Sequence, residues 1–179
     1  MNENTGMNIP FEPLTQELLE DGSYLKKAIN ICNNNRTENN IVALSRILRD
    51  SNVWVPCNAI MSDADYEAWT KAFMEAQEND DLDSLVGQEF VSHDNIRMVP
   101  DILTNGEDFF FPVFTSAEEM GEYGEHFSKV GSHFLGAANL AVNNEKEVVG
   151  IVINPFSEAF FVPREMFDII AKLESSVED

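Results

Sequence analysis

The three histidines are the first side chains to consider for chemistry, because imidazole is a common catalytic base and metal ligand. They are His93, His126 and His133. His126 and His133 are seven residues apart and could share one helix face, but Gly131 lies between them and interrupts a helix. A zinc site would also need a third ligand, such as Glu122 or Glu125. We therefore interpret the histidines as ordinary surface or core residues and expect no metal site.

Three hydroxyl and amide side chains follow strand-like segments. Ser116 has no G-x-S-x-G context, and Glu119 three residues later gives it the pattern of a capping box at a helix start. Thr115 and Asn154 each follow an apolar run. Polar residues at strand ends can hold a ligand, although cap and turn roles also explain them. Thr115 and Asn154 are thus the candidate ligand-binding residues, and we assign no catalytic residue.

The cysteines and the acidic segment offer no cofactor chemistry. Cys32 and Cys57 stand far apart in apolar surroundings, which is typical of free buried thiols in a reducing compartment. The acidic segment at 78–83 resembles the start of a calcium loop, but Ser84 stands where the turn glycine belongs and Phe90 where the bidentate glutamate belongs. We therefore expect no cofactor.

The charge of the chain limits its partners. Among 179 residues there are 11 basic and 32 acidic side chains, a net charge of −21. Such a surface repels phosphate backbones and anionic headgroups, so we expect neither nucleic acid nor membrane as a partner. The charge is compatible with a solvated surface and with attraction of a basic protein. No secretory signal and no apolar run of about 18 residues is present, so we expect a cytoplasmic protein.

The first half of the sequence predicts helices. A loose arm at 1–13 precedes helical apolar spacing at 14–31, which Gly22 interrupts. Thr37 can cap a second helix, and Ser62 can cap a third with Asp65 as its partner. Between them, the β-rich segment 53–55 predicts an edge strand or a strand end, limited by Pro56.

The third predicted helix carries three aromatic residues at positions i, i+3 and i+7, namely Tyr66, Trp69 and Phe73. This spacing places the three rings in one stripe. Packing of the stripe in the core is the common reason for such a pattern. If the stripe is exposed instead, it is a candidate surface for a protein partner.

The second half predicts strands alternating with helices. Asn105-Gly106 predicts a hairpin between runs at 96–103 and 109–114, and Asn154-Pro155 predicts a turn between strands at 148–153 and 159–162. Helices are expected at 117–127 and 134–142 and from Pro163 onward. The pattern predicts an α+β fold, a mostly antiparallel sheet with helices packed against it and a helical N-terminal extension.

Three segments together resemble the N-terminal domain of the SseB family, the enhanced-serine-sensitivity proteins. They are the helix and strand at 41–55, the run Asp108-Phe-Phe-Phe-Pro-Val-Phe-Thr-Ser116, and Gly150-Ile-Val-Ile-Asn-Pro155 with the strand and helix after it. The resemblance implies an α+β fold in the bacterial cytoplasm, and it implies no particular reaction or cofactor. It divides the chain into an arm and helical extension at 1–35, the SseB-like domain at 36–174 and an acidic tail at 175–179.

Two functions are compatible with these residues. The first is a non-enzymatic protein-binding or adaptor module that uses Tyr66, Trp69 and Phe73. The second is a small-molecule sensor, related to amino acids as the family name suggests, or an unrecognised enzyme with a pocket near Thr115 and Asn154. We favour the first, since no convergent polar cluster is visible in the sequence. Formation of a homo-oligomer through an edge strand is compatible with both.

Overall fold

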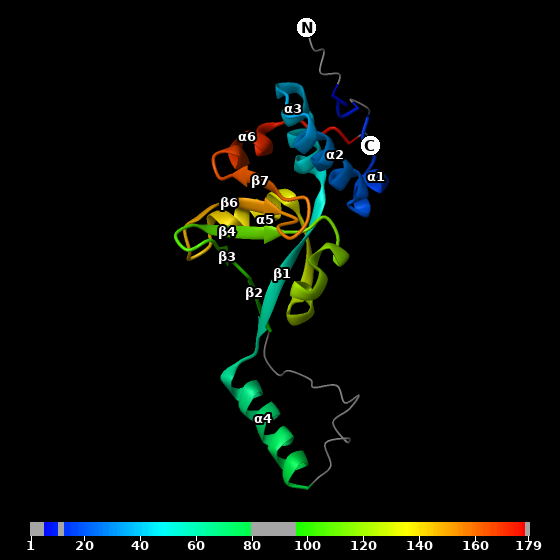
Figure 1. The fold of residues 1–179 in the computed structure, drawn as a ribbon. Coiled ribbons are helices and arrows are strands. Elements are labelled where there is room, and N and C mark those ends of the chain that lie inside the picture. The colour runs from blue at the N-terminus through cyan, green and yellow to red at the C-terminus, as the bar shows by residue number, and fades with distance from the viewer. Residues whose placement is uncertain (1–5, 11–12, 80–95, 178–179) are drawn as a thin grey trace. The chain divides into compact units, whose positions relative to one another are not determined.

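The structure is a computed structural model, and it describes residues 6–10, 13–79 and 96–177. Two compact units make up the chain (Figure 1). The main unit comprises residues 1–57 and 100–179, and the second unit comprises residues 58–99. Strands β1 (Asn52–Ile60) and β2 (Arg97–Pro100) each cross the division between the units, while helix α4 (Asp63–Glu78) belongs to the second unit.

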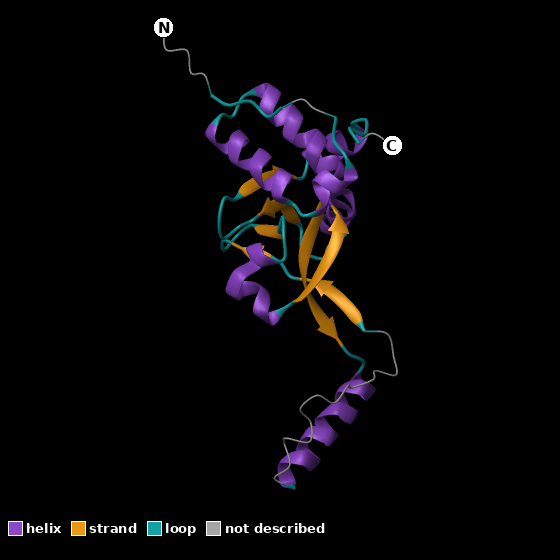
Figure 2. Cartoon of the chain, turned by 90° about the vertical axis from the view of Figure 1, so that its right-hand side faces the viewer, coloured by secondary structure: helices purple, strands orange, loops and turns teal. Residues whose placement is uncertain are grey.

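The main unit combines helices and strands, which confirms the predicted α+β class. Its helical elements are α1 (Gln16–Glu20), α2 (Ser23–Asn34), α3 (Glu38–Asp50), the 3-10 helix η2 (Glu118–His126), α5 (Phe134–Val142) and α6 (Met166–Lys172). Its other strands are β3 (Leu103–Thr104), β4 (Phe109–Val113), β5 (Ser128–His133), β6 (Val148–Ile153) and β7 (Phe160–Pro163). The N-terminal helices gather on one side of these strands (Figure 2).

The main sheet has the strand order β3-β4-β6-β7. The hairpin at Asn105-Gly106 and the turn at Asn154 are both confirmed, because β3 pairs antiparallel with β4 and β6 pairs antiparallel with β7. The central pair β4 and β6 is parallel and lies side by side in Figure 1. This pairing places the C-terminal ends of β4 and β6, which are distant in the sequence, side by side. Thr115 and Asn154 follow these two strand ends.

A second sheet has the order β2-β1-β5 and corrects two expectations. The predicted run at 96–103 splits, because β2 joins this sheet while β3 joins the other. Pro56 does not end a strand: β1 continues through it to Ile60 and lies between two neighbours. The Pro56 carbonyl accepts a hydrogen bond from Asp101 N at 2.9 Å, and its missing N–H points to the same side. The ladder with β5 therefore loses no donor at Pro56.

The core of the main unit lies against one face of the main sheet. Phe111 and Val113 of β4 point to this face, and the residue between them points to the other face. Ile151 and Ile153 of β6 lie beside them, and all four side chains are completely buried. The helices contribute residues such as Leu25, Leu44, Leu48 and Ala137 to the same cluster. The arm is held more firmly than we expected, since Ile9 is buried and its N–H donates to Asn40 Oδ1 at 2.9 Å.

Helix starts were predicted with mixed success. The Thr37 cap is confirmed by a 3.3 Å hydrogen bond from Asn40 N to Thr37 Oγ1. The capping box at Ser116 is wrong: η2 begins after Ala117 without a side-chain cap, and Glu119 binds distant residues instead. Pro163 does not start the last helix but closes β7, because the chain continues the ladder with Gly150 at this position.

Candidate functional site

Helix α4 is built by a local signal that the sequence contains in full. Ser62 Oγ accepts a hydrogen bond from Asp65 N at 3.2 Å, so the predicted cap at Ser62 is confirmed; Asp65 takes part through its carboxylate Oδ2, which accepts from the Ser62 hydroxyl at 3.2 Å. Asp63 and Asp65 also place negative charge at the positive end of the helix dipole. The helix runs to Glu78, and Asn79 caps its other end by donating from its backbone N–H to Glu75 O.

The aromatic stripe of α4 lies on the surface. Tyr66, Trp69 and Phe73 are 59%, 42% and 41% exposed, and none of them belongs to the hydrophobic core cluster. The rings lie against one another along the helix: the centroids of Tyr66 and Trp69 are 6.4 Å apart, and those of Trp69 and Phe73 are 5.7 Å apart with nearly parallel planes. Packing of the stripe in the core, the common reason for such spacing, is therefore wrong here. We call these three side chains the aromatic face of α4.

Acidic side chains outnumber basic ones on helix α4. Helix α4 carries five acidic residues and one basic residue, Lys71, which gives it a net charge of −4. Lys71 Nζ lies 3.8 Å from Glu75 Oε1 on the helix surface, so it partly neutralises its own helix. Met74 is a further exposed apolar residue of the same helix, with 55% of its surface accessible. The helix therefore presents an apolar face in a strongly negative setting.

The structure brings Thr115 and Asn154 together, and it places both in the interior. They follow the adjacent ends of the parallel strands β4 and β6 and are 2% and 0% exposed. Asn154 Oδ1 accepts from Thr115 N at 2.9 Å, and Asn154 Nδ2 donates to Thr115 Oγ1 at 3.0 Å. The two side chains thus satisfy each other. A ligand would have to open this pair, so their role in binding stays a prediction.

A glycine outside the predicted site completes this corner. Gly22 lies between α1 and α2 with a φ of +74°, and a Cβ atom built on it would lie 1.8 Å from Thr115 O. The backbone at Gly22 therefore lies so close to Thr115 O that only glycine, which has no Cβ atom, fits at this position. The interruption of the helical pattern at 14–31 was visible in the sequence, but its cause, close contact with Thr115, was not.

Glu119 joins three segments next to this corner. Lys26 Nζ from α2 donates to Glu119 Oε1, and Ser157 Oγ from the turn after β6 donates to Glu119 Oε2 at 2.9 Å. The Lys26 ammonium hydrogen-bonded to Glu119 holds the pKa of this carboxyl below its usual value, and the Ser157 hydroxyl acts in the same direction against partial burial. No local sequence signal predicts this set, because its members are distant in the chain.

A second unpredicted cluster surrounds Tyr123 in η2. The Tyr123 ring lies 4.8 Å from Phe127 and 4.9 Å from Phe156, and its hydroxyl donates to Asp101 Oδ2. Burial, and then the hydrogen bond to Asp101, raise the pKa of the Tyr123 hydroxyl well above its ordinary value. A neutral, hydrogen-bonded phenol of this kind fixes η2 to the chain at Asp101.

The histidines and cysteines do not converge in the described part of the chain. His126 lies exposed in η2, His133 caps α5 by accepting from Leu135 N at 3.4 Å, and His93 lies outside the described residues. Cys32 and Cys57 are buried free thiols, and burial raises the pKa of both. Among the described residues, no group of three or more histidine, cysteine, aspartate or glutamate side chains could hold a metal ion.

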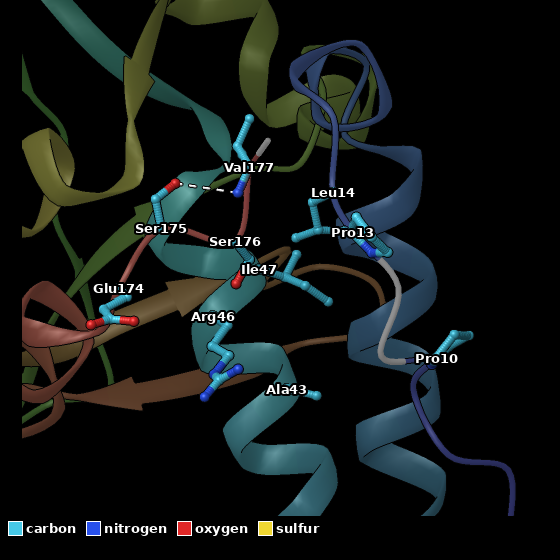
Figure 3. A pocket seen from close by; sticks show the side chains of 10 residues that line it. All are labelled: Pro10, Pro13, Leu14, Ala43, Arg46, Ile47, Glu174, Ser175, Ser176 and Val177. Atoms are coloured by element: carbon cyan, nitrogen blue, oxygen red, sulfur yellow. Dashed lines mark hydrogen bonds between the residues drawn. The ribbon is translucent and has the colours of Figure 1, made fainter. Parts of the chain in front are cut away.

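A pocket of about 410 Å³ lies between α3 and the two ends of the described chain (Figure 3). Arg46 and Ile47 of α3 form one wall, and the segment 174–177 forms another. Leu14 pairs with Val177 in a short parallel bridge, and Asp50 Oδ2 accepts from Ser176 N at 2.8 Å. Pro10 and Pro13 in the lining flank residues 11–12, which lie outside the described residues, so we assign this pocket no ligand.

No described helix has the length and apolar character needed to cross a membrane.

One of three comparisons with known proteins finds a match. No curated protein and no solved structure matches the chain. The family model described as the SseB protein N-terminal domain matches residues 25–167, about four fifths of the sequence. The match contains most of α2, all of α3 and α4, both sheets, and Thr115 with Asn154, and the chain therefore belongs to the SseB family.

Proposed function

We propose that this chain is a protein-binding module, and that the aromatic face of α4 holds a basic amphipathic helix of its partner. The observation that carries the proposal is the exposure of Tyr66, Trp69 and Phe73, each above 40%, in one continuous stack. Exposed aromatic side chains cost free energy in water, and they are enriched among the residues that dominate protein interfaces. A helix that presents such a stripe is suited to pack against another amphipathic helix.

The negative charge of α4 favours a positively charged partner. The net charge of −4 on α4 and of −21 on the whole chain attract a positive helix and increase its rate of association. A second copy of α4 would bring two helices of net charge −4 together and is disfavoured for the same reason. Apolar residues on one face of the partner would cover the three rings, while its lysine or arginine residues would be attracted by the net negative charge of α4.

A synthetic helix tests the proposal directly. The probe is a peptide of about 18 residues with leucine at helical i, i+3, i+4 and i+7 spacing and lysine elsewhere. Substitution of Trp54 by phenylalanine leaves Trp69 as the single tryptophan, so its fluorescence reports contact with the aromatic face. We expect saturable binding with a Kd of about 1–10 μM, and about tenfold weaker binding when NaCl rises from about 0.05 to 0.5 M.

Variants separate contact with the rings from general attraction to an acidic protein. Replacement of Tyr66, Trp69 and Phe73 by alanine is expected to weaken binding at least about tenfold, followed by anisotropy of the labelled peptide. Ile169→Ala is the matched control, because Ile169 is 53% exposed on α6, and it should leave the Kd unchanged. Equal binding by the triple variant would show that charge alone attracts the peptide and would contradict the proposal.

The same variants report on the fold. Since its indole is 42% exposed, Trp69→Ala is expected to change the free energy of unfolding by less than about 1 kcal/mol, whereas a core tryptophan would cost about 3–5 kcal/mol. Urea denaturation provides this measurement. A large loss of stability would assign the ring to packing within the chain and would remove it from the binding surface.

A further inference from the structure

Strand β7 is an edge strand of the main sheet, and some backbone groups on its outer side form no hydrogen bond with described residues. It pairs with β6 alone, in the register Val162 with Ile151 and Phe160 with Ile153. Arg164 N donates to Val149 O at 3.0 Å, which shows that every second residue, starting from Arg164, points its backbone groups toward β6. The N–H and C=O of Phe161 therefore point away from the sheet, and neither has a hydrogen-bond partner among the described residues.

The open part of this edge is short. At one end, Ala159 O accepts from Asn33 Nδ2 at 3.3 Å, so this carbonyl is already occupied. At the other end, Pro163 has no N–H and offers only its carbonyl. An added strand can thus form a pair of hydrogen bonds with Phe161 and one more with Pro163 O. The end of a polypeptide, about three or four residues long, is suited to such a short ladder.

A groove of about 220 Å³ lies beside this edge. Its walls come from α3, β7 and α6, and they are almost wholly apolar. Leu44, Leu48 and Ile170 are each 1% exposed at the bottom, and Met166 lies partly buried at the side. The volume is enough for one large apolar side chain together with part of its backbone. A strand added to β7 would direct alternate side chains into it.

A cationic side chain lies where the added strand would end. Arg36 lines the groove, and its guanidinium lies 5.5 Å from the centroid of the Phe160 ring, next to the occupied carbonyl of Ala159. Arg36 is exposed and forms no ion pair with a described acidic residue. In a chain of net charge −21, an arginine that forms no ion pair with the described acidic residues and lies at the mouth of an apolar groove is suited to receive an anion.

We propose that β7 and this groove bind the carboxyl-terminal residues of a partner polypeptide as an added antiparallel strand. The last apolar side chain fills the groove, Phe161 pairs with the peptide backbone, and Arg36 receives the terminal carboxylate. The antiparallel direction follows from charge, because it places the carboxyl end of the peptide near Arg36. A parallel strand would place a positive amino terminus there. This site lies in the main unit and is independent of the aromatic face of α4.

Short peptides test this site on the full chain. The probe is a fluorescein-labelled hexapeptide of alternating threonine and valine that ends in leucine with a free carboxylate, together with versions that end in valine or phenylalanine. The matched control is each peptide with a C-terminal amide. We expect a Kd of about 10–100 μM for at least one free acid, with binding to its amide about tenfold weaker. No binding by any free acid up to about 1 mM, or equal binding of acid and amide, would overturn the proposal.

Substitutions at Phe161 distinguish strand addition from simple filling of the groove. Phe161→Pro removes the outward N–H at an edge position where proline is tolerated, and it should weaken binding at least about tenfold. Phe161→Ala keeps the N–H and removes only a ring that lines the groove, so its Kd should rise by less than that of Phe161→Pro. Arg36→Gln should reduce the affinity for the free acid to that for the amide. Retention of full affinity by Phe161→Pro and Arg36→Gln would contradict strand addition.

Amide hydrogen exchange gives a second measurement that needs no substitution. The outward Phe161 N–H should exchange rapidly in the free chain and at least about tenfold more slowly with saturating peptide. The Ile151 N–H, within the β6 ladder, is the internal control and should stay protected in both states. Unchanged exchange at Phe161 in the presence of bound peptide would show that the peptide does not pair with β7.

Discussion

At the scale of single residues, Asn154 combines an unusual backbone conformation with buried side-chain hydrogen bonds. Its φ of +48° is the one positive value among the described non-glycine residues, a conformation that asparagine tolerates better than most residues. The same side chain pairs with Thr115, and its N–H donates to Val113 O at 2.9 Å. A turn residue and a buried hydrogen-bond partner are therefore combined in one position.

Substitution of Asn154 should separate these two roles. Asn154→Ala leaves the buried Thr115 N–H without an acceptor and strains the backbone, so we expect a loss of about 2–4 kcal/mol in the free energy of unfolding. Asn154→Gly also loses the side-chain hydrogen bonds but accepts the positive φ, and its loss should be about 1 kcal/mol smaller. Urea denaturation of both variants measures the difference. Equal losses would show that backbone strain contributes little at this position.

At the scale of elements, the start of α2 is fixed by its contact with the end of β4. The main sheet and the N-terminal helices meet where Gly22 approaches Thr115 O, and Lys26 in the next turn of α2 binds Glu119 of η2. Both contacts lie on one side of α2. The helix is thereby positioned along the strand ends, and this position also brings Asn33 and Arg36, at and just after its end, to β7.

A methyl group at Gly22 should disturb this junction. Gly22→Ala places a Cβ atom against a backbone carbonyl in a residue with positive φ, so we expect a loss of at least about 2 kcal/mol. Gly131→Ala is the control, because no atom lies within 4 Å of the added Cβ and the backbone is unstrained; it should cost less than about 0.5 kcal/mol. Thermal and urea unfolding measure both. Native stability of Gly22→Ala would place Thr115 farther from α2 than the structure does.

At the scale of the whole molecule, negative charge dominates. The net charge is −21, whereas three ion pairs join described residues, and only the Lys26–Glu119 and Arg49–Asp50 pairs have partly buried partners. Repulsion among the remaining carboxylates opposes the compact state. The same excess charge would attract the basic partner proposed above, so a lower stability and the proposed binding would have one cause.

Screening should therefore stabilise the chain. We expect the free energy of unfolding to rise by about 1 kcal/mol as NaCl increases from about 0.05 to 0.5 M, because salt weakens repulsion between exposed charges. Urea denaturation at each salt concentration measures the effect. Glu122→Gln with Glu125→Gln, both exposed in η2, should raise stability at low salt and reduce the dependence on salt. Destabilisation by salt would show that attractive ion pairs outweigh the repulsion.

The sequence by itself determined the elements whose signals are local. The caps at Thr37 and Ser62, the break at Gly22 and the turns at Asn105 and Asn154 were all predictable, because each depends on residues within a few positions of one another. Wherever a partner lies far away in the chain, prediction failed. Glu119 was assigned to a cap and instead binds Lys26 and Ser157, and β5 was not recognised as a strand.

Only the tertiary structure decided which surfaces are covered. The spacing of Tyr66, Trp69 and Phe73 establishes one helix face, but spacing is the same for a buried stripe and an exposed one. Likewise, Thr115 and Asn154 were recognisable as polar strand ends, but their mutual hydrogen bonds depend on the parallel pairing of β4 and β6. Periodicity is a local property of the chain, whereas burial depends on what the rest of the chain places against each face.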